Sequence, residues 1–557
     1  MMPDDQTDAF DAGPLSYADP IPTDWLDTLP SVAECLRPYQ RTQIEQSAQA
    51  LRAGYRRVLV QGATGSGKTH VLSAIVAAAA AAGIPALVLA TRTRLVRQIH
   101  ERLEEFGIRH GVIAAPLAHL RDYSARVQVA SVDTLHRRSV VDRHIPMPSA
   151  GLVLFDECHL ATADTRLNIL DSYPDAIRIG LTATPARKSG RSLNAAFDCL
   201  ILGPMPRELV HADMLVPFRI FNTPIATQTE LKALPKDNEN DYRVDGLSAL
   251  VCKPKLVGDV LENWCRIAKG KRTLLFCVNK AHGGALLAEF LRNGIKAEML
   301  TDQDDEATRE EVVARLERGD THVVLNCFLL SYGVDVPSVE CIVLARPTRS
   351  LPMYLQMVGR GSRPSLETGK HDCVLIDHGH VVENLGLPQS DFPWTLDETR
   401  NVNREAQERA RNAATETLRT CKQCTALWLT SEQGHACPEC GWTPAPKAKP
   451  VTVQRADLQE MADDDRKPVW ASDPRVVRFF REACGWYAKH WPERWREKQK
   501  SGRWASWMNT VEKFGFSESV RIPTSFWELE PLPGGLEVSG WCQHRLIKRA
   551  RSKARAA

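Results

Sequence analysis

The 557-residue chain has no apolar run of about 18 residues, the length that a helix needs to cross a membrane. Its first 30 residues contain seven aspartates and neither Lys nor Arg. Signal and transit peptides carry basic residues, so neither class fits this start. The acidic, proline-rich residues 1–30 instead predict a flexible tail, and the chain as a whole predicts a cytoplasmic protein.

Closely spaced cysteines are also scarce, because most of the 15 cysteines stand alone in apolar runs, as reduced core thiols do. The exception is two C-x-x-C pairs, Cys421 with Cys424 and Cys437 with Cys440, separated by twelve residues. Two such pairs predict a structural Zn²⁺ site of zinc-ribbon type, with a redox role as the alternative. Four cysteine ligands leave no open position, so this zinc would contribute folding energy and no hydrolysis.

Net charge is only +3, but the charges are unevenly distributed. Residues 466–557 hold 19 Lys and Arg, nine Asp and Glu, and eight of the 13 tryptophans. Basic side chains attract phosphates and exposed tryptophans stack on bases. Tryptophans at helical spacing also form the cores of small helical domains. We therefore expect a small basic C-terminal domain with mostly buried tryptophans and a basic face that binds a polyanion.

The segment from Gln61 to Thr69 matches the phosphate-binding P-loop pattern, G-x-x-x-x-G-K-[ST]. An apolar strand over 58–60 enters it and an alanine-rich helix over 70–82 leaves it. Backbone N–H groups at such a helix start bind polyphosphates. We expect Lys68 to contact the β- and γ-phosphates and the Thr69 hydroxyl to bind Mg²⁺. The predicted nucleotide-binding loop comprises Gly62, Ala63, Thr64, Gly65, Ser66, Gly67, Lys68 and Thr69.

Strand and helix patterns alternate between residues 86 and 181, which predicts a parallel sheet with ligands at the carboxyl ends of its strands. The strand over 152–155 runs directly into Asp156 and Glu157. A carboxylate at the end of a buried strand is costly without a cation to face. We therefore expect Asp156 to hold Mg²⁺ and Glu157 to position and deprotonate the attacking water.

Other polar residues follow neighbouring strands. Hydroxyl and guanidinium groups there predict contacts with a sugar-phosphate backbone, by Thr91, Arg92, Ser131 and Thr134. Helix capping is an equally good explanation of these residues. Thr182 and Thr184 end the next strand and would couple the Asp156 loop to bound nucleic acid, with His159 as a bridge. A strand end stopped by proline is the alternative for the two threonines, and a packed loop histidine is an equally good explanation of His159.

About twenty residues before the P-loop, Arg37, Tyr39 and Gln40 predict an adenine site in which the glutamine amide pairs with the base. In order, this glutamine, GATGSGKT, DECH, TAT and QMVGRGSR resemble the superfamily 2 helicases and translocases of the DEAD/DEAH-box kind, in a DECH variant. The resemblance covers Leu36 to Asp377. It implies two RecA-like domains that close on ATP at their interface and hold nucleic acid across their tops.

The same resemblance assigns residues of the second domain. It places Arg360 and Arg363 on the γ-phosphate and adds Gln356 to the catalytic set. Gly333 and Asp335 lie in a stretch similar to the family's fifth motif, where they would contact ribose and the partner domain. Helicase domains followed by a four-cysteine module and a basic end look like the bacterial RadD-type DNA repair helicases.

We therefore expect an α/β fold with two tandem RecA-like parallel-sheet domains, a zinc ribbon and a small basic C-terminal domain. The predicted parts are an acidic tail (1–30), a first RecA-like domain (31–213), a second (214–395), a zinc-ribbon module (396–445), a linker (446–465) and the basic domain (466–557). The predicted function is that of an ATP-dependent DNA helicase or translocase in DNA repair or phage DNA metabolism, with ATP, Mg²⁺ and Zn²⁺ as cofactors. Alternatives are an RNA helicase, the motor subunit of a restriction or anti-phage complex, and an ATP-gated nucleic-acid clamp. A protein partner could bind the zinc ribbon or the basic domain.

Overall fold

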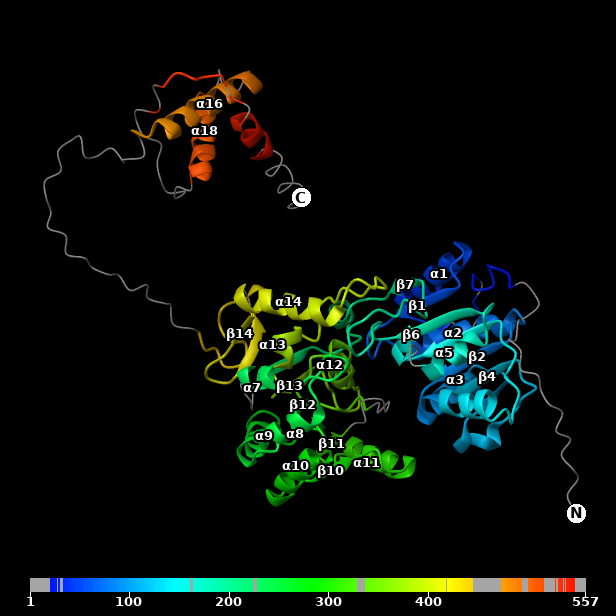
Figure 1. Cartoon of the computed structure of the whole chain (residues 1–557). Helices are drawn as coiled ribbons and strands as arrows, with labels where there is room; N and C mark the ends of the chain where they lie inside the picture. Colours follow the sequence, from blue (N-terminus) through cyan, green and yellow to red (C-terminus); the bar gives the residue numbers. More distant parts are fainter. Residues whose placement is uncertain are drawn as a thin grey trace, which may run out of the picture. The chain divides into compact units, whose positions relative to one another are not determined.

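The computed structural model describes residues 21–27, 29–30, 34–160, 164–223, 228–327, 336–416, 418–443, 472–492, 499–514, 526, 529–533, 535 and 537–545. The chain divides into two compact units, residues 1–445 and 446–557 (Figure 1). Gly333 and Asp335 fall outside the described residues, as does the linker predicted over 446–465. Among the described helices, none combines the length and apolar character that would let it span a membrane.

The first sheet consists of seven parallel strands in the order β3-β4-β2-β5-β6-β1-β7. These strands are β1 (Arg57–Gln61), β2 (Ala86–Ala90), β3 (His110–Ile113), β4 (Val127–Ser131), β5 (Leu152–Asp156), β6 (Ile177–Thr182) and β7 (Cys199–Leu202). One face shares a core with α1 (Pro38–Arg52), α2 (Lys68–Ala81) and α3 (Thr93–Glu105). The other face packs against α4 (Val132–Leu135) and α5 (Asp164–Asp171). Because both faces are covered, the central strands are buried along their whole length.

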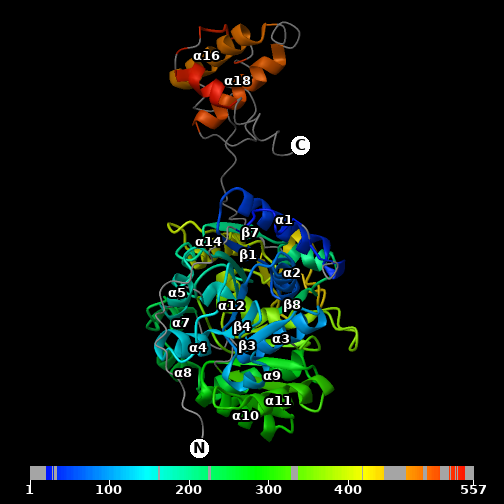
Figure 2. The ribbon, with the colours of Figure 1, turned by 90° about the vertical axis from the view of Figure 1, so that its right-hand side faces the viewer.

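The second sheet has the strand order β10-β11-β9-β12-β13-β8-β15-β14. Its parallel strands are β8 (Phe218–Asn222), β9 (Thr273–Cys277), β10 (Ala297–Leu300), β11 (Val323–Cys327), β12 (Cys341–Leu344) and β13 (Cys373–Asp377). The helices are α7 (Gln228–Ala233), α8 (Val244–Val251), α9 (Pro254–Ile267), α10 (Lys280–Arg292), α11 (Glu306–Arg318), α12 (Leu351–Val358), α13 (Val381–Leu385) and α14 (Val402–Glu416). In Figures 1 and 2 the blue-to-cyan first sheet and the green-to-yellow second sheet belong to adjacent bodies. Two parallel sheets in tandem confirm the predicted RecA-like architecture.

The four-cysteine module is joined to the second sheet. Its strand β15 (Ala426–Leu429) pairs antiparallel with β8, and β14 (Leu418–Thr420) pairs with β15. Arg219 of β8 donates through Nε and Nη2 to both carboxylate oxygens of Glu439, at 2.8 and 2.5 Å. A bidentate pair of this kind fixes orientation as well as distance. The module predicted over 396–445 therefore continues the second sheet, and its domain bounds stay a prediction.

The segment ahead of α1 differs from the expected flexible tail over 1–30. Trp25 and Leu26 are buried, with 6% and 2% of their surfaces exposed, in the core that α1 and α2 share with the first sheet. Burial of a large aromatic side chain offsets the entropy that ordering the segment costs. The acidic composition of these residues hid this anchor, so the flexible-tail prediction is wrong for residues 25 and 26.

The C-terminal unit contains two long helices, α16 (Pro474–His490) and α18 (Gln499–Phe514). Trp486 and Trp507 are buried between packed aromatic rings, with 7% and 0% exposure. Trp491 is 37% exposed. The expectation that most tryptophans form a core therefore holds for Trp486 and Trp507, whereas Trp491 is partly exposed and its ring lies 5.4 Å from that of Tyr487.

We expect acid to destabilise the residue 1–445 unit through two buried histidines. Burial lowers the pKa of His282 and of His378 to about 4, against about 6.5 in an unfolded chain. Stability is then fully present above about pH 6.5 and falls as pH drops toward 4, by about 3 kcal/mol for each histidine. Denaturant unfolding at pH 7.5, 5.5 and 4.5 should show this loss, and His282→Asn should reduce its slope. An unchanged slope in the variant would contradict the assignment.

Candidate nucleotide-binding site between the two sheets

The P-loop lies between β1 and α2, as the sequence predicts. Gly65 and Gly67 adopt φ values of +85° and +81°, which side-chain-bearing residues adopt only with strain. Gly67 directly precedes the first turn of α2, so the amino end of that helix, with Lys68 and Thr69, lines the cavity beside the loop. An anion placed there would meet backbone donors and the positive end of the helix.

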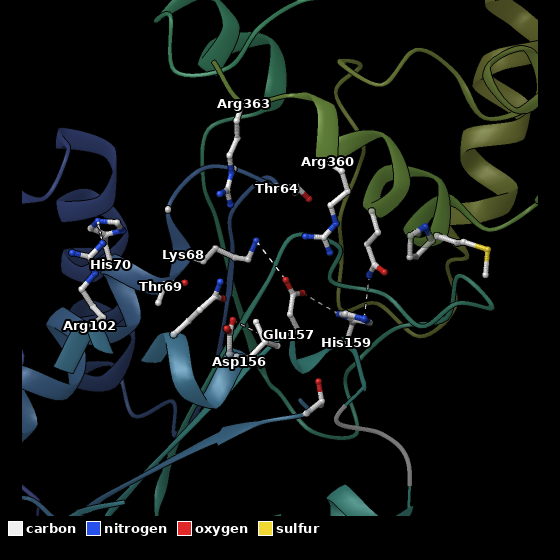
Figure 3. Close-up of a pocket in the computed structure, with 18 of the residues that line it drawn as sticks. Thr64, Lys68, Thr69, His70, Arg102, Asp156, Glu157, His159, Arg360 and Arg363 are labelled. Atoms are coloured by element: carbon white, nitrogen blue, oxygen red, sulfur yellow. Dashed lines mark hydrogen bonds and ion pairs between the residues drawn. The ribbon is translucent and has the colours of Figure 1, made fainter. Parts of the chain in front are cut away.

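The loop opens into a cavity of about 1260 Å³ that both sheets line. Figure 3 shows the side chains of Lys68, Glu157, Arg360 and Arg363 pointing toward one another across it. Lys68 Nζ donates to the Gly62 carbonyl at 3.3 Å and lies 3.9 Å from Glu157 Oε1. Its ammonium group is thus held within the cavity by weak, exchangeable contacts.

Asp156 ends β5 and is 4% exposed. Burial, together with the neighbouring Glu157 carboxylate, raises the pKa of Asp156. One of its oxygens accepts the Glu157 N–H at 3.0 Å, and the residue lines the cavity beside Thr69. A buried carboxylate next to a hydroxyl is an oxygen donor set that Mg²⁺ takes. The residues present therefore fit the predicted ion.

Glu157 adopts a left-handed backbone conformation, with a φ of +50°. Such strain in a residue other than glycine is found at functional sites. Burial alone would raise the pKa of Glu157, but Lys68 and His159 draw it below its usual range. The carboxylate is therefore ionised and can accept a proton from water.

A chain of polar contacts runs from Glu157 to the second sheet. His159 Nδ1 lies 3.4 Å from Glu157 Oε2 and 3.3 Å from Thr182 Oγ1. Gln356 reaches across from α12, with its Nε2 at 3.1 Å from His159 Nε2 and 3.4 Å from Thr184 Oγ1. The Thr184 N–H donates to Thr182 Oγ1 at 3.1 Å. The structure thus brings the predicted coupling residues together, and their role in coupling stays a prediction.

The turn after α12 lies directly on the P-loop. A Cβ atom built on Gly359 would come within 2.6 Å of Thr64 Cβ, so only glycine fits at this contact. Arg363 packs against Gly65 in the same way, because a Cβ there would lie 3.2 Å from Arg363 Cγ. Burial lowers the pKa of both Arg360 and Arg363. Two desolvated guanidiniums beside the P-loop form a site for a highly charged anion.

The predicted adenine residues brace the P-loop in this structure. Gln40 Nε2 donates to the carbonyls of Ser66 and Gly67 at 2.9 and 3.2 Å. The Tyr39 hydroxyl donates to the Ser66 carbonyl at 2.6 Å, and Arg37 Nη1 donates to Tyr39 at 3.2 Å. Arg37 and Gln40 also line the cavity. Their contact with adenine stays a prediction.

The four predicted backbone-binding residues occupy different settings. Thr91 is 6% exposed and lines the nucleotide cavity. Arg92 and Ser131 directly precede α3 and α4, and Ser131 is 6% exposed. Thr134 accepts the Ala115 N–H through Oγ1 at 3.4 Å. Contacts of these residues with nucleic acid stay predictions.

Several residues that line the cavity escaped the motif analysis. They are His70, Arg102, Arg187, Lys188 and Arg346. Arg346 follows β12 by two residues, and Arg187 comes shortly after β6. A basic residue shortly after a buried strand was therefore a usable signal at Arg346, and at Arg187 together with the adjacent Lys188. No local pattern marks His70 and Arg102.

The four predicted zinc cysteines converge, with all four sulfur atoms within 4.8 Å of one another. Cys421 and Cys440 have their sulfurs 3.6 Å apart, as do Cys424 and Cys437. A tetrahedral ion with Zn–S bonds of about 2.3 Å separates its sulfurs by about 3.8 Å, so this set fits Zn²⁺. Backbone N–H groups of Gln423 and Cys424 donate to Cys421 Sγ, at 3.3 and 3.4 Å, and would orient that ligand.

Removal of zinc is expected to unfold more than the cysteine loop, because β15 belongs to the second sheet. Structural zinc contributes on the order of 10 kcal/mol in small modules. Cys437→Ser, or a strong chelator, should therefore lower the Tm of the whole residue 1–445 unit. Cys35→Ser, an exposed cysteine outside the cluster, is the control. A Tm that is equal with and without chelator would show that no metal stabilises this unit.

A P-loop and an acidic pair on one parallel sheet face two arginines from a second such sheet across a shared cavity, an arrangement that resembles that of the superfamily 2 helicases and translocases. Two family models match in tandem. "Type III restriction enzyme, res subunit" matches residues 34–187, which hold the P-loop and the acidic pair. "Helicase conserved C-terminal domain" matches residues 252–365, which hold the arginines.

Proteins similar in sequence come from yeast and phage. The chain is 28% identical over 368 residues to the ATP-dependent helicase IRC3 of Saccharomyces cerevisiae, covering 62% of this chain and 51% of IRC3. It is 27% identical over 383 residues to a 51.5 kDa protein of a Lactococcus phage, covering 69% of this chain and 77% of that protein. The chain thus spans about half the length of IRC3.

A solved structure shares the fold. It is a fragment of an HsdR subunit of a type I restriction enzyme from Vibrio vulnificus YJ016, with a TM-score of 0.51 and 24% identity. The match covers 66% of this chain and 68% of that one. At this level of identity the likeness shows the fold alone.

Proposed function

We propose that this chain hydrolyses ATP and couples hydrolysis to movement on nucleic acid. The observation that supports this most directly is the shared cavity, because residues of two sheets line it together. Lys68 and Glu157 come from the first sheet and the two arginines from the second. A triphosphate bound there would contact both, so cleavage and product release would change how the two sheets attract each other.

Each step of the proposed reaction falls to residues of this chain. The P-loop N–H groups and Lys68 bind the β- and γ-phosphates. Thr69 and Asp156 would hold Mg²⁺, which supplies charge neutralisation on the phosphate oxygens. Glu157 accepts a proton from the attacking water while Lys68 and His159 orient its carboxylate. Arg360 and Arg363 stabilise the charge that develops on the transferred phosphoryl group.

The contacts of Gln356 offer a way for ATP hydrolysis to move the second sheet relative to the first. Through His159, Gln356 connects α12 of the second sheet to the catalytic carboxylate of the first. If the Glu157 side chain shifts when the γ-phosphate leaves, the contacts through His159 and Gln356 would therefore shift α12 as well. We propose that this path couples hydrolysis to relative motion of the sheets, and that Thr182 and Thr184 take part in it.

DNA is the proposed track, in DNA repair as in the RadD-type helicases or in phage DNA metabolism. Restriction enzymes act on DNA, and a restriction-enzyme family model covers residues 34–187. The basic residues after 466 add a polyanion-binding face to the chain. The zinc module and the basic unit are also candidate docking sites for a protein partner.

A second candidate is the motor subunit of a restriction or anti-phage assembly. The match of residues 34–187 to the res subunit of type III restriction enzymes favours it. In that case DNA cleavage would need a further subunit. Purified chain would then consume ATP on DNA without cutting it.

The test is the steady-state ATPase rate with no nucleic acid, with single-stranded DNA, with duplex DNA and with RNA, each at two salt concentrations. We expect DNA to stimulate turnover, and the stimulation to weaken as salt rises. Lys68→Ala should abolish turnover in every condition. A rate that no nucleic acid changes would overturn the translocase proposal, and stimulation by RNA alone would overturn the choice of DNA.

A further inference from the structure

Three metal-ligating side chains meet on the first sheet, away from the P-loop. They are His100 and Glu104 on α3, one helical turn apart, and His110, the first residue of the edge strand β3. One donor atom from each lies within 4.8 Å of the others. Apart from the four cysteines, no other group of this kind occurs among the described residues.

Hydrogen bonds pre-orient the inner ligand. The His110 side chain is fully buried, and its Nδ1 lies 2.7 Å from the Ile108 carbonyl. A carbonyl can only accept, so Nδ1 carries the proton and the lone pair of Nε2 is directed away from that carbonyl. His100 Nδ1 faces this nitrogen at 2.7 Å. A histidine whose second nitrogen donates to a backbone carbonyl is the usual arrangement of a zinc ligand.

The third ligand, Glu104, adds a negative charge and lies where solvent can reach the site. Glu104 offers a carboxylate oxygen within 4.8 Å of a donor atom of each histidine, and its side chain is 64% exposed. An ion can therefore enter from solvent past Glu104 and reach the buried nitrogen of His110. Two imidazoles and one carboxylate leave a fourth tetrahedral position for water.

Only the outer ligands have to move. Zn–N bonds of about 2.0–2.1 Å in a tetrahedral site separate two nitrogens by about 3.3 Å, which is wider than the present 2.7 Å. His100 is half-buried on the helix surface, so its ring can shift by this amount while His110 stays in place. The paired imidazoles of this structure are thus close to, and convertible into, a metal-binding arrangement.

We propose that His100, Glu104 and His110 bind a divalent zinc-class ion that pins α3 to the edge strand β3. This site is distinct from the four-cysteine module and from the nucleotide cavity. Its ligand set of two imidazoles and a carboxylate suits zinc and its neighbours in the first transition row, not Ca²⁺. The ion would hold in place the helix whose inner face lines the nucleotide cavity at Leu95 and Gln98.

Metal analysis of the purified full chain, dialysed against Zn²⁺ and then against a weak chelator, tests the proposal. We expect two zinc ions per wild-type chain and one per chain for His100→Ala. Loss of a direct ligand should weaken the second site by more than about 100-fold, since loss of an outer partner alone costs 10–100-fold. Glu104→Gln, an exposed and near-isosteric change, should weaken it without a risk to folding.

A second measurement separates this site from the cysteines. Co²⁺ added to a chain from which chelator has removed the ion of this site, while the cysteines keep their zinc, should give visible absorption without a thiolate-to-metal charge-transfer band, because no sulfur is a ligand. His119→Ala is the matched control, since His119 is an exposed histidine nearby that is outside the cluster. Equal zinc content in wild type and His100→Ala would overturn the proposal. So would equal loss in His119→Ala, or a thiolate band from the added Co²⁺.

Discussion

Glu157→Gln is expected to slow ATP hydrolysis by about 10²–10⁴-fold while ATP still binds. The amide keeps the size of the side chain and its place between Lys68 and His159, but it cannot take a proton from water. Lys68 and the P-loop donors remain, so the affinity for the triphosphate should be kept. The variant should therefore accumulate in an ATP-bound state.

Single-turnover hydrolysis and equilibrium binding of ATP, measured on the same preparation, check this expectation. Glu101→Gln is the control, because Glu101 lines the same cavity from α3 and has no place in the proposed chemistry. The control should hydrolyse ATP at the wild-type rate. If Glu157→Gln retains rapid turnover, the proton acceptor is another group. If it loses ATP binding as well, Glu157 acts in binding and not in the chemical step.

The sequence predicts those parts of the site that are encoded by short, continuous stretches of the chain. The P-loop, the acidic pair after β5 and the arginines after α12 are each contained in a few consecutive residues. Alternating apolar strands and amphipathic helices predict a parallel sheet, and a parallel sheet gathers the carboxyl ends of its strands at one edge. The order of the motifs along the chain therefore predicts which of these residues meet in the site.

The sequence contains no comparable motif for contacts between segments that are far apart in the chain. Asn401 and Asn403, at the start of α14, donate to the carbonyls of Ser189 and Lys188, more than 200 residues earlier. A Cβ atom on Gly190 would come within 2.5 Å of Asn401. These bonds hold the loop after β6 against the second half of the chain. Neither residue belongs to a motif, and asparagine near a helix start reads from sequence as a cap.

For the cysteine module, too, the sequence predicts the ligands but not the long-range contacts. The two C-x-x-C pairs predict the ligand set, because four sulfurs around one ion impose a spacing. The pairs carry no information about where the module docks. Strand β15 completes the second sheet through two paired residues of β8 and the Arg219–Glu439 contact. Such a short strand is recognisable only once its partner strand is known.

Removal of either arginine is expected to lower kcat by about 10³–10⁵-fold with a smaller change in ATP affinity. In Figure 3 both guanidiniums point toward Lys68 across the cavity, from the turn that packs on Thr64. They come from the second sheet, so their contribution depends on the two sheets being together. Arg360→Ala and Arg363→Ala should therefore bind ATP and turn it over very slowly.

Conservative variants sharpen this test. Arg360→Lys keeps a positive charge but loses the planar fork, so partial activity would indicate a point charge and none would indicate bidentate contact. Arg318→Ala is the control, since Arg318 is exposed on α11, where it pairs with Asp320, and does not line the cavity. kcat and KM measured for all four variants, with and without DNA, separate chemistry from binding. If Arg360→Ala and Arg363→Ala hydrolyse ATP as the control does, the second sheet takes no part in the reaction, and a motor driven by closure of the two sheets on ATP is excluded.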